Sequence, residues 1–319
     1  MKQPAITNFN QQRVWIIGAS SGIGEACAKA LLRQNARVAL SSRRVERLEA
    51  IAAEFNPSNY LILPVDVTKT NQIEDAYHTL EEHWGGIDLL LFVSGIYIPM
   101  RADQFDMDDA RKTIDSNLLG PMQAVATVLP AMLKDGKGHI AIVGSVAGYS
   151  GLPKALAYGP SKAAIINFCE TLYYDLLPQG ISVHMISPGF VATEATAQND
   201  FEMPALISAD TAANEILRGM LREVETNFSN GNVTIKLKLT PPEVQDVALT
   251  GSIGSNDQMV SLKDAIRELL TREDVGFSDV YFRSAFSVDD KGETDDLEFK
   301  NSDGGKDGPK SVWPMDQDR

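Results

Sequence analysis

The chain has 319 residues, of which 44% are hydrophobic and 7% aromatic, so it can bury one large core or two unequal ones without a disulfide or a metal. Its 29 basic and 43 acidic residues give a formal net charge of −14, and such a negative field repels phosphate backbones and anionic lipids. The composition therefore disfavours nucleic acids and membrane surfaces as partners.

Short apolar runs alternate with amphipathic stretches over about the first 228 residues. The runs predict strands at residues 14–17, 38–40, 60–63, 88–93, 139–143 and 181–186. The stretches predict helices at residues 23–33, 45–55, 71–84, 108–133, 157–177 and 209–225. Near-continuous apolar strands joined by helices indicate an α/β protein with a doubly wound parallel sheet (Rossmann fold), which binds ligands at the carboxyl ends of its strands.

The pattern changes after the last of these helices. Alternation between Val233 and Leu239 predicts one more strand, and residues 262–270 predict a short helix. The last 33 residues hold ten acidic and five basic side chains, a net of −5, and few apolar ones, which is typical of a disordered tail. We divide the chain into a dinucleotide-binding and catalytic domain, an extension of uncertain structure, and an acidic tail, at residues 1–229, 230–286 and 287–319.

The two cysteines, Cys27 and Cys169, lie in apolar helical patterns and are expected to be reduced core residues of a cytoplasmic protein. The polar N-terminus has no apolar stretch of signal-peptide length, and no apolar run approaches the ~20 residues that span a bilayer. The four histidines show no spacing typical of a metal site, so we predict no metal.

A glycine-rich turn joins the first predicted strand to the first predicted helix. Gly18 permits a tight turn, Gly22 allows the backbone to approach a pyrophosphate, and Gly24 allows close packing of the helix on the strand. A helix N-terminus offers free N–H groups and partial positive charge to phosphates. Glycine is common in loops, so the motif counts only because a strand precedes it and a helix follows it. The candidate cofactor-binding residues here are Gly18, Ser20, Ser21, Gly22, Ile23 and Gly24.

The end of the second predicted strand bears on the choice of cofactor. NAD-binding domains place an acidic residue there for the ribose 2′-hydroxyl, whereas this chain continues as Ser41, Ser42, Arg43 and Arg44. Arg43 is suited to pair with a 2′-phosphate, with Ser42 beside it, so we favour NADP(H) over NAD(H). The alternative is an ordinary solvated start of a helix.

A possible catalytic group comes from the fifth strand and the helix after it. Tyr158 and Lys162 are four residues apart and share a helix face, and Ser145 ends the preceding strand. Tyrosine has a pKa of ~10, and lowering it by ~3 units requires roughly 4 kcal/mol of preferential phenolate stabilisation. Lys162 and a positive nicotinamide ring are candidates for that stabilisation, with Ser145 positioning the substrate oxygen. The alternative is a packed tyrosine beside a solvated lysine.

Together these residues resemble the classical short-chain dehydrogenase/reductases over roughly residues 13–220. The resemblance rests on the segment Gly18 to Gly24, on Asp66, Asn117 and Ser145, on Tyr158-Gly159-Pro160-Ser161-Lys162, and on Pro188-Gly189-Phe190-Val191-Ala192-Thr193. It implies that Tyr158 is the general acid/base and that Lys162 binds the nicotinamide ribose and lowers the pKa of Tyr158. It also implies that Ser145 orients the substrate carbonyl and that Asn117 supports a water that relays protons.

The resemblance also implies further cofactor contacts. Asp66, with Val67 beside it, corresponds to the adenine contact, the alternative being a carboxylate near the start of a helix. The segment with Pro188, Gly189, Val191 and Thr193 corresponds to the one that passes the nicotinamide and the pyrophosphate. The family also implies a homodimer or homotetramer built partly by the helices that carry Asn117 and Tyr158.

The chain departs from the family pattern in two places. Phe92-Val93-Ser94-Gly95 stands where the family has Asn-Asn-Ala-Gly, so Gly95 keeps the close approach to the cofactor while side-chain hydrogen bonds are lost. We expect other contacts to compensate for them. The residues after 230 do not match the usual glycine-rich, dimer-forming tail, which weakens the expectation of an oligomer.

We therefore predict an NADP(H)-dependent oxidoreductase that interconverts a carbonyl, either ketone or aldehyde, and an alcohol. The alternative is a non-catalytic dinucleotide sensor or interaction protein on the same fold. Apolar residues between 96 and 100 and between 190 and 207 favour a lipophilic substrate, although plain packing explains them equally well. The sets are Ile96, Tyr97, Ile98, Met100, and Phe190, Val191, Phe201, Met203, Pro204, Leu206, Ile207.

Overall fold

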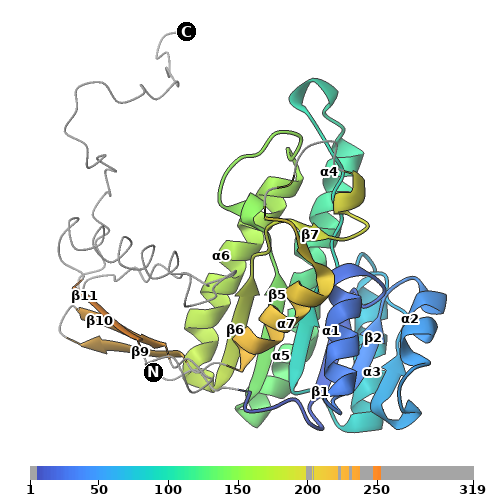
Figure 1. Cartoon of the computed structure of the whole chain (residues 1–319), viewed down its shortest axis with the longest axis vertical. Helices are drawn as coiled ribbons and strands as arrows, with labels where there is room; N and C mark the ends of the chain where they lie inside the picture. The colour runs from blue at the N-terminus through green and yellow to red at the C-terminus, as the bar shows by residue number, and fades with distance from the viewer. Residues whose placement is uncertain are drawn as a thin grey trace. The chain divides into compact units, whose positions relative to one another are not determined.

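The computed structural model describes residues 6–198, 203 and 205–221, and the backbone of three further strands at residues 224–229, 232–237 and 247–252. Its main sheet has six parallel strands in the order β3-β2-β1-β4-β5-β6 (Figure 1). The strands are β1 (Arg13–Ile17), β2 (Arg37–Ser41), β3 (Tyr60–Ile62), β4 (Leu89–Phe92), β5 (Gly138–Val143) and β6 (Ile181–Ile186). This order confirms the predicted doubly wound Rossmann fold.

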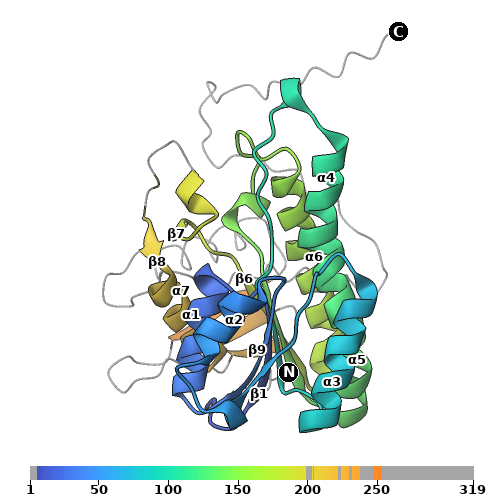
Figure 2. The same cartoon turned by 90° about the vertical axis from the view of Figure 1, so that its right-hand side faces the viewer.

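Helices cover both faces of the sheet, which is why its strands are apolar almost throughout. Figure 2 shows α1, α2 and α7 on one face and α3, α5 and α6 on the other. Their bounds are α1 (Gly22–Arg33), α2 (Val45–Ala52), α3 (Thr70–Trp84), α5 (Gly120–Asp135), α6 (Tyr158–Leu176) and α7 (Ala209–Met220). Alternate residues of β1 enter the two cores: Trp15 packs with α3, and Ile16 packs with α1. Cys27 and Cys169 are buried in the core, as predicted, and neither forms a disulfide.

The long helix expected at residues 108–133 consists of three parts. It begins as α4 (Met107–Ile114), widens to a π-helical turn at Asp115–Leu119, and continues as α5. The side chain of Asp106 caps α4 by accepting hydrogen bonds from two backbone N–H groups. The wide turn holds Asn117, so its geometry matters for the site described below.

The helix expected at residues 209–225 is too long. It ends as α7 at Met220, and β9 (Val224–Ser229) follows it. The prediction was wrong because Val224, Thr226 and Phe228 favour a strand when a partner strand is present, and β10 (Asn232–Leu237) pairs with β9 in antiparallel register.

A second sheet has three antiparallel strands in the order β11-β10-β9. The strand predicted at 233–239 is β10, and it pairs with β9 and with β11 (Val247–Ser252) but not with the six-stranded sheet. The boundary predicted at residue 229 therefore falls between two paired strands. The helix predicted at 262–270 and the tail at 287–319 lie outside the described residues.

The loops between the main strands and helices contain the remaining short elements. The two-residue strands β7 (Val191–Ala192) and β8 (Ile207–Ser208) pair in parallel ahead of α7. Single 3₁₀ turns lie at Pro57–Asn59, Ala102–Gln104, Val146–Gly148, Leu177–Gln179 and Thr196–Gln198. Across the described part of the chain, no helix has both the length and the apolar character needed to cross a membrane.

Candidate active site

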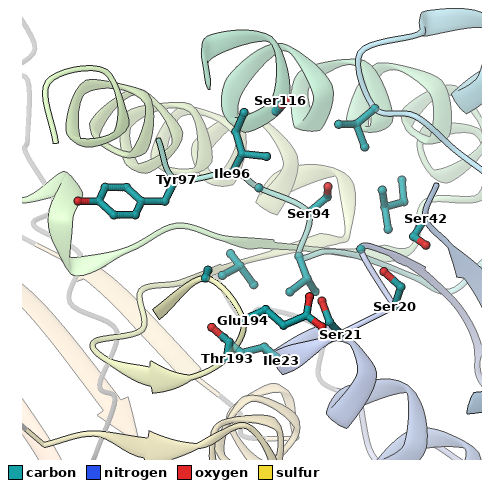
Figure 3. Close-up of a pocket in the computed structure, with 18 of the residues that line it drawn as sticks. Ser20, Ser21, Ile23, Ser42, Ser94, Ile96, Tyr97, Ser116, Thr193 and Glu194 are labelled. Atoms are coloured by element: carbon teal, nitrogen blue, oxygen red, sulfur yellow. The ribbon is translucent and has the colours of Figure 1, made fainter. Parts of the chain in front are cut away.

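A cavity of about 410 Å³ opens at the carboxyl edge of the main sheet (Figure 3). Its volume is within the range of small-molecule and cofactor sites. Most of the predicted site residues line it: Gly18, Ser20, Ser21, Gly22, Ile23, Ser42, Arg43, Asp66, Val67, Gly95, Ser145, Tyr158, Lys162, Pro188, Gly189, Val191 and Thr193. The structure brings these together from segments far apart in the sequence. The other two predicted residues, Gly24 and Asn117, lie behind the wall.

The glycine turn has the geometry that a phosphate cradle needs. Gly18 has a φ of +103°, and a Cβ there would lie 2.5 Å from the backbone nitrogen of Ser94. A Cβ on Gly24 would clash with the carbonyl oxygen of Gly18, so Gly24 is required for packing the helix on the turn. Helix α1 begins at Gly22, and Ser21 caps it without a side-chain hydrogen bond. The first N–H groups of α1 therefore remain available to an anion, which fits a dinucleotide pyrophosphate.

Ser145, Tyr158 and Lys162 converge at the other end of the cavity. Ser145 follows β5, Tyr158 is the first residue of α6, and Lys162 lies one turn further along that helix. The Ser145 hydroxyl hydrogen-bonds to the phenol oxygen of Tyr158. The Lys162 side chain is buried, and its Nζ donates to the carbonyl oxygen of Val143 at 2.9 Å. Its Nζ is 5.7 Å from the centre of the Tyr158 ring.

Burial controls the ionisation of both groups. It raises the pKa of Tyr158, and the opposing hydrogen bond from Ser145 does not reverse the shift. It lowers the pKa of Lys162 to about 8. The sequence predicts a lowered pKa for Tyr158, with Lys162 and a bound nicotinamide ring as its causes. The protein groups alone do not lower it, and the Nζ of Lys162 donates to a backbone carbonyl.

Asn117 is held in the π-helical turn by a neighbouring loop. Its Oδ1 accepts from the N–H of Ile96 at 2.8 Å, and its Nδ2 donates to the carbonyl of Ile96 at 2.9 Å and to Ser161 Oγ at 3.2 Å. Ser161 in turn donates to the carbonyl of Tyr158 at 2.7 Å. A chain of hydrogen bonds thus joins Asn117 to the backbone of Tyr158. Sequence reasoning assigned no role to Ser161.

The segment that departs from the family pattern is held by its backbone. The N–H groups of Val93 and Ser94 donate to the carbonyl of Ile17 at 2.8 and 2.9 Å. A Cβ on Gly95 would lie 3.2 Å from Asn117 Oδ1 and 3.5 Å from Lys162 Nζ. Gly95 therefore leaves room for Asn117 and Lys162 beside it. The paired bonds between Ile96 and Asn117 tie this loop to the π-helical turn.

Asp66 and Arg43 lie at the end of the cavity away from Tyr158. Burial acts to raise the pKa of Asp66, but hydrogen bonds from the N–H and hydroxyl of Thr68 and the charge of Arg43 outweigh it, so the pKa is lowered. The Thr68 bonds, at 3.0 and 2.8 Å, give Asp66 a turn-stabilising role beside its place on the wall. Arg43 is exposed at the rim.

The cavity wall includes two charged residues, Arg44 and Glu194, to which the sequence analysis assigned no role. Arg44 donates to Ser20 Oγ at 3.1 Å and to Ser21 Oγ at 2.5 Å, and its Nη1 lies 2.7 Å from Glu194 Oε2. Ser21 and Glu194 both point from the cavity wall in Figure 3. Arg44 is adjacent to the predicted Arg43, but no sequence pattern links it to Glu194, which is 150 residues away.

Residues 12–203 match the family model described as short chain dehydrogenase. The chain belongs to the short-chain dehydrogenase family. Its relatives include an uncharacterized oxidoreductase of Myxococcus xanthus, 35% identical over 216 residues, which cover 67% of this chain and 85% of the relative. An uncharacterized oxidoreductase of Staphylococcus epidermidis is 32% identical over 222 residues, 69% and 95% of the two chains. The protein is thus an NAD(P)-dependent short-chain dehydrogenase/reductase.

Solved structures of other proteins share this fold. The crystal structure of gox2181 has a TM-score of 0.61 at 24% identity and covers 66% of this short-chain dehydrogenase and 88% of its own chain. The structure of ElxO with NADP bound has a TM-score of 0.60 at 24% identity, with coverage of 65% and 90%. At these identities the likeness concerns the fold.

Among the described residues, no cluster of three or more His, Cys, Asp or Glu is placed to bind a metal.

Proposed function

We propose that this short-chain dehydrogenase interconverts a ketone or aldehyde and an alcohol with NADP(H), and that Tyr158 is its general acid/base. The observation that carries the proposal is the convergence of Ser145, Tyr158 and Lys162 on the cavity that the glycine turn also lines. The alternative, a dinucleotide sensor without catalysis, needs the glycine turn but gains nothing from a buried lysine beside a tyrosine.

Each residue has a role that follows from its position. Tyr158 gives a proton to the substrate oxygen during reduction and takes it back during oxidation. Ser145, which already bonds the phenol oxygen, positions that substrate oxygen. When bound, the nicotinamide ring supplies or accepts the hydride. Lys162 adds positive charge near the phenol, and Asn117, fixed to Ile96, supports the proton path behind it.

The preference for NADP(H) rests on charge at one end of the cavity. The glycine turn and the start of α1 fit the pyrophosphate, and Asp66 lies on the wall proposed for adenine. Arg43 and Arg44 follow β2 where NAD-specific domains have a carboxylate, so they are placed for a 2′-phosphate. The NADP bound to ElxO, a protein of the same fold, is consistent with this assignment.

The proposed substrate is lipophilic. Ile96, Tyr97 and Val191 line the cavity, whereas Met100 is buried and belongs to the packing. The loop around Met100 pairs with the segment between β5 and α6, since the N–H of Met100 donates to the carbonyl of Lys154 at 2.8 Å. That segment exposes several apolar side chains, namely Val146, Tyr149, Leu152 and Leu156. Phe201 and Pro204 of the predicted set lie outside the described residues.

We further propose a homodimer or homotetramer in the cytoplasm. Helix α5 with the π-helical turn before it exposes Leu119, Met122 and Leu133, and α6 exposes Tyr174. These are the helices that the family resemblance assigns to subunit contacts. The two cysteines are buried and form no disulfide, which is consistent with a reducing compartment.

The catalytic assignment is tested with Tyr158→Phe. A panel of aldehydes and ketones graded by apolar surface, followed by NADPH absorbance, first identifies a substrate. We expect kcat to fall by about 10²–10⁴-fold or more, because the proton donor is lost, while the calorimetric Kd for NADP⁺ stays within about twofold. Tyr174→Phe, on the exposed face of the same helix, is the matched control. Near-normal turnover by Tyr158→Phe would contradict the assignment.

The cofactor preference is tested with Arg43→Ala and Arg44→Ala. Each is expected to weaken NADPH binding by about tenfold or more while changing NADH binding less than about twofold, because the 2′-phosphate that NADH lacks is the cofactor group proposed to make charge-assisted bonds to these side chains. Arg33→Ala, at the far end of α1, controls for loss of positive charge. Equal weakening of both cofactors would refute the role of the arginines.

A further inference from the structure

A small ion cluster connects two elements across the wall of the cavity. Glu194, just after β7, pairs with Arg44 before α2 at 2.7 Å and with Arg47 in α2 at 3.5 Å. Arg44 also donates to the hydroxyls of Ser20 and Ser21 in the glycine turn. The carboxylate is therefore linked to the glycine turn through Arg44, and both charged residues line the cavity.

The donors of Arg44 are engaged in this arrangement. Its Nε donates to Ser20, its Nη2 to Ser21 and its Nη1 to Glu194, so each nitrogen of the guanidinium has an oxygen partner. A guanidinium binds a phosphate most strongly through two parallel N–H groups. A phosphate at Arg44 would therefore compete with these oxygens for the guanidinium, and only Glu194 among them is an anion.

Glu194 is well suited to that exchange. The hydrogen bond from Arg44, and then the charge of that residue, lower the pKa of Glu194, so the carboxylate is ionised at neutral pH. The side chains are partly exposed, 42% for Arg44 and 55% for Glu194, which keeps their pairing weak enough to be exchanged. The carboxylate also extends from a short loop segment and not from the core.

We propose that Glu194 is a specificity-determining residue of the cofactor site, a carboxylate that neutralises Arg44 and competes with the 2′-phosphate of NADP(H). The inference rests on the proposed NADP(H) binding. It implies that Glu194 lowers affinity for the phosphorylated dinucleotide and leaves affinity for NAD(H) nearly unchanged. The ratio of the two affinities is thus set by Glu194 as well as by the arginines.

The test is Glu194→Gln in the full chain, which keeps the size of the side chain and removes its charge. Isothermal titration calorimetry at 0.15 M salt measures the Kd of NADP⁺ and of NAD⁺. We expect NADP⁺ to bind about two- to fivefold more tightly, the range set by an exposed ion pair, and NAD⁺ to change by less than about 1.5-fold. Glu46→Gln, an exposed carboxylate in the first turn of α2, is the charge-matched control and should shift neither Kd selectively.

A double variant shows whether the effect passes through Arg44. In the Arg44→Ala background, Glu194→Gln should lose most of its selective gain, because the two side chains no longer compete for one partner. Three results would overturn the inference: an unchanged or weaker NADP⁺ affinity in Glu194→Gln, an equal gain for both dinucleotides, or a full gain without Arg44.

The same titrations separate this inference from the proposed cofactor preference. A wild-type chain that binds NAD⁺ more tightly than NADP⁺, with no selective gain for NADP⁺ in Glu194→Gln, would overturn the preference and the role of Glu194 together. A wild-type chain that prefers NADP⁺, with an unaffected Glu194→Gln variant, would overturn only the role of Glu194.

Discussion

Lys162 is placed for the proposed catalysis, but its burial is unfavourable for the stability of the folded protein. Its ammonium group is buried and donates to the carbonyl of Val143 at 2.9 Å. Burial lowers its pKa to about 8, against a usual value of ~10.4 for lysine. At neutral pH the folded protein thus holds a buried charge, which is unfavourable for stability.

We predict that Lys162→Met stabilises the protein at pH 7 while abolishing turnover. The lowered pKa corresponds to an upper bound of about 3 kcal/mol, and the carbonyl of Val143 loses its partner, so a gain of about 1–2 kcal/mol in the free energy of unfolding is expected. Between pH 8 and about 10.4 the unfolded wild-type chain binds the lysine proton and the folded one releases it. The free energy of unfolding of the wild type therefore rises with pH in this window, so its difference from that of Lys162→Met becomes smaller.

Urea unfolding at pH 7 and pH 9.5 measures the difference. Lys69→Met removes an exposed ammonium as the control and should show no such pH dependence. A loss of stability at pH 7, or a gain that grows with pH, would contradict the prediction.

At the scale of elements, the sequence predicts those structures whose determinants are local. β1 and β4 are almost wholly buried, so their unbroken apolar runs reveal them. The π-helical turn at Asp115–Leu119 is different, because its sequence is compatible with an ordinary helix. Its Asn117 hydrogen-bonds to Ile96, twenty-one residues earlier in the chain. Contacts between residues so far apart leave no periodic pattern in the sequence from which they can be predicted.

The parts of the site also differ in whether local or distant residues determine them. The glycine turn and the pair Tyr158 and Lys162 have fixed local spacing, so the sequence predicts them and the structure places them on one cavity. The pairing of Arg44 with Glu194 bridges 150 residues and forms only once β7 lies near the start of α2. The extent of β9 likewise depends on β10 as its partner, which a local helical pattern conceals.

The hydrophobic core uses residues that come later in the chain than any described residue of the cavity wall. The described residues that line the cavity lie between Ile17 and Thr196, and the family match ends at residue 203. Helix α7 comes after both, yet its Ala213, Ile216 and Leu217 are buried in the same cluster as Cys27 and Leu31 of α1. The helix therefore belongs to the catalytic domain through its packing, although it contributes no cavity residue.

We predict that a chain ending at residue 221 folds and keeps the NADP⁺ affinity of the full chain within about twofold, since the cavity and α7 are complete. A chain ending at residue 229 would be a poorer choice, because β9 would keep an unpaired edge without β10. A chain ending at residue 208 loses α7 and exposes the side chains of α1 that α7 covers.

Each large apolar side chain withdrawn from the core costs about 1.5–3 kcal/mol, so losing α7 removes an amount comparable to the 5–15 kcal/mol that holds a typical protein folded. The shorter chain should lack a cooperative thermal transition in circular dichroism, and calorimetry should detect no NADP⁺ binding. A cooperative transition in the chain ending at 208 would show that α7 is dispensable. Failure of the chain ending at 221 would show instead that residues beyond α7 are needed to stabilise the cofactor-binding core.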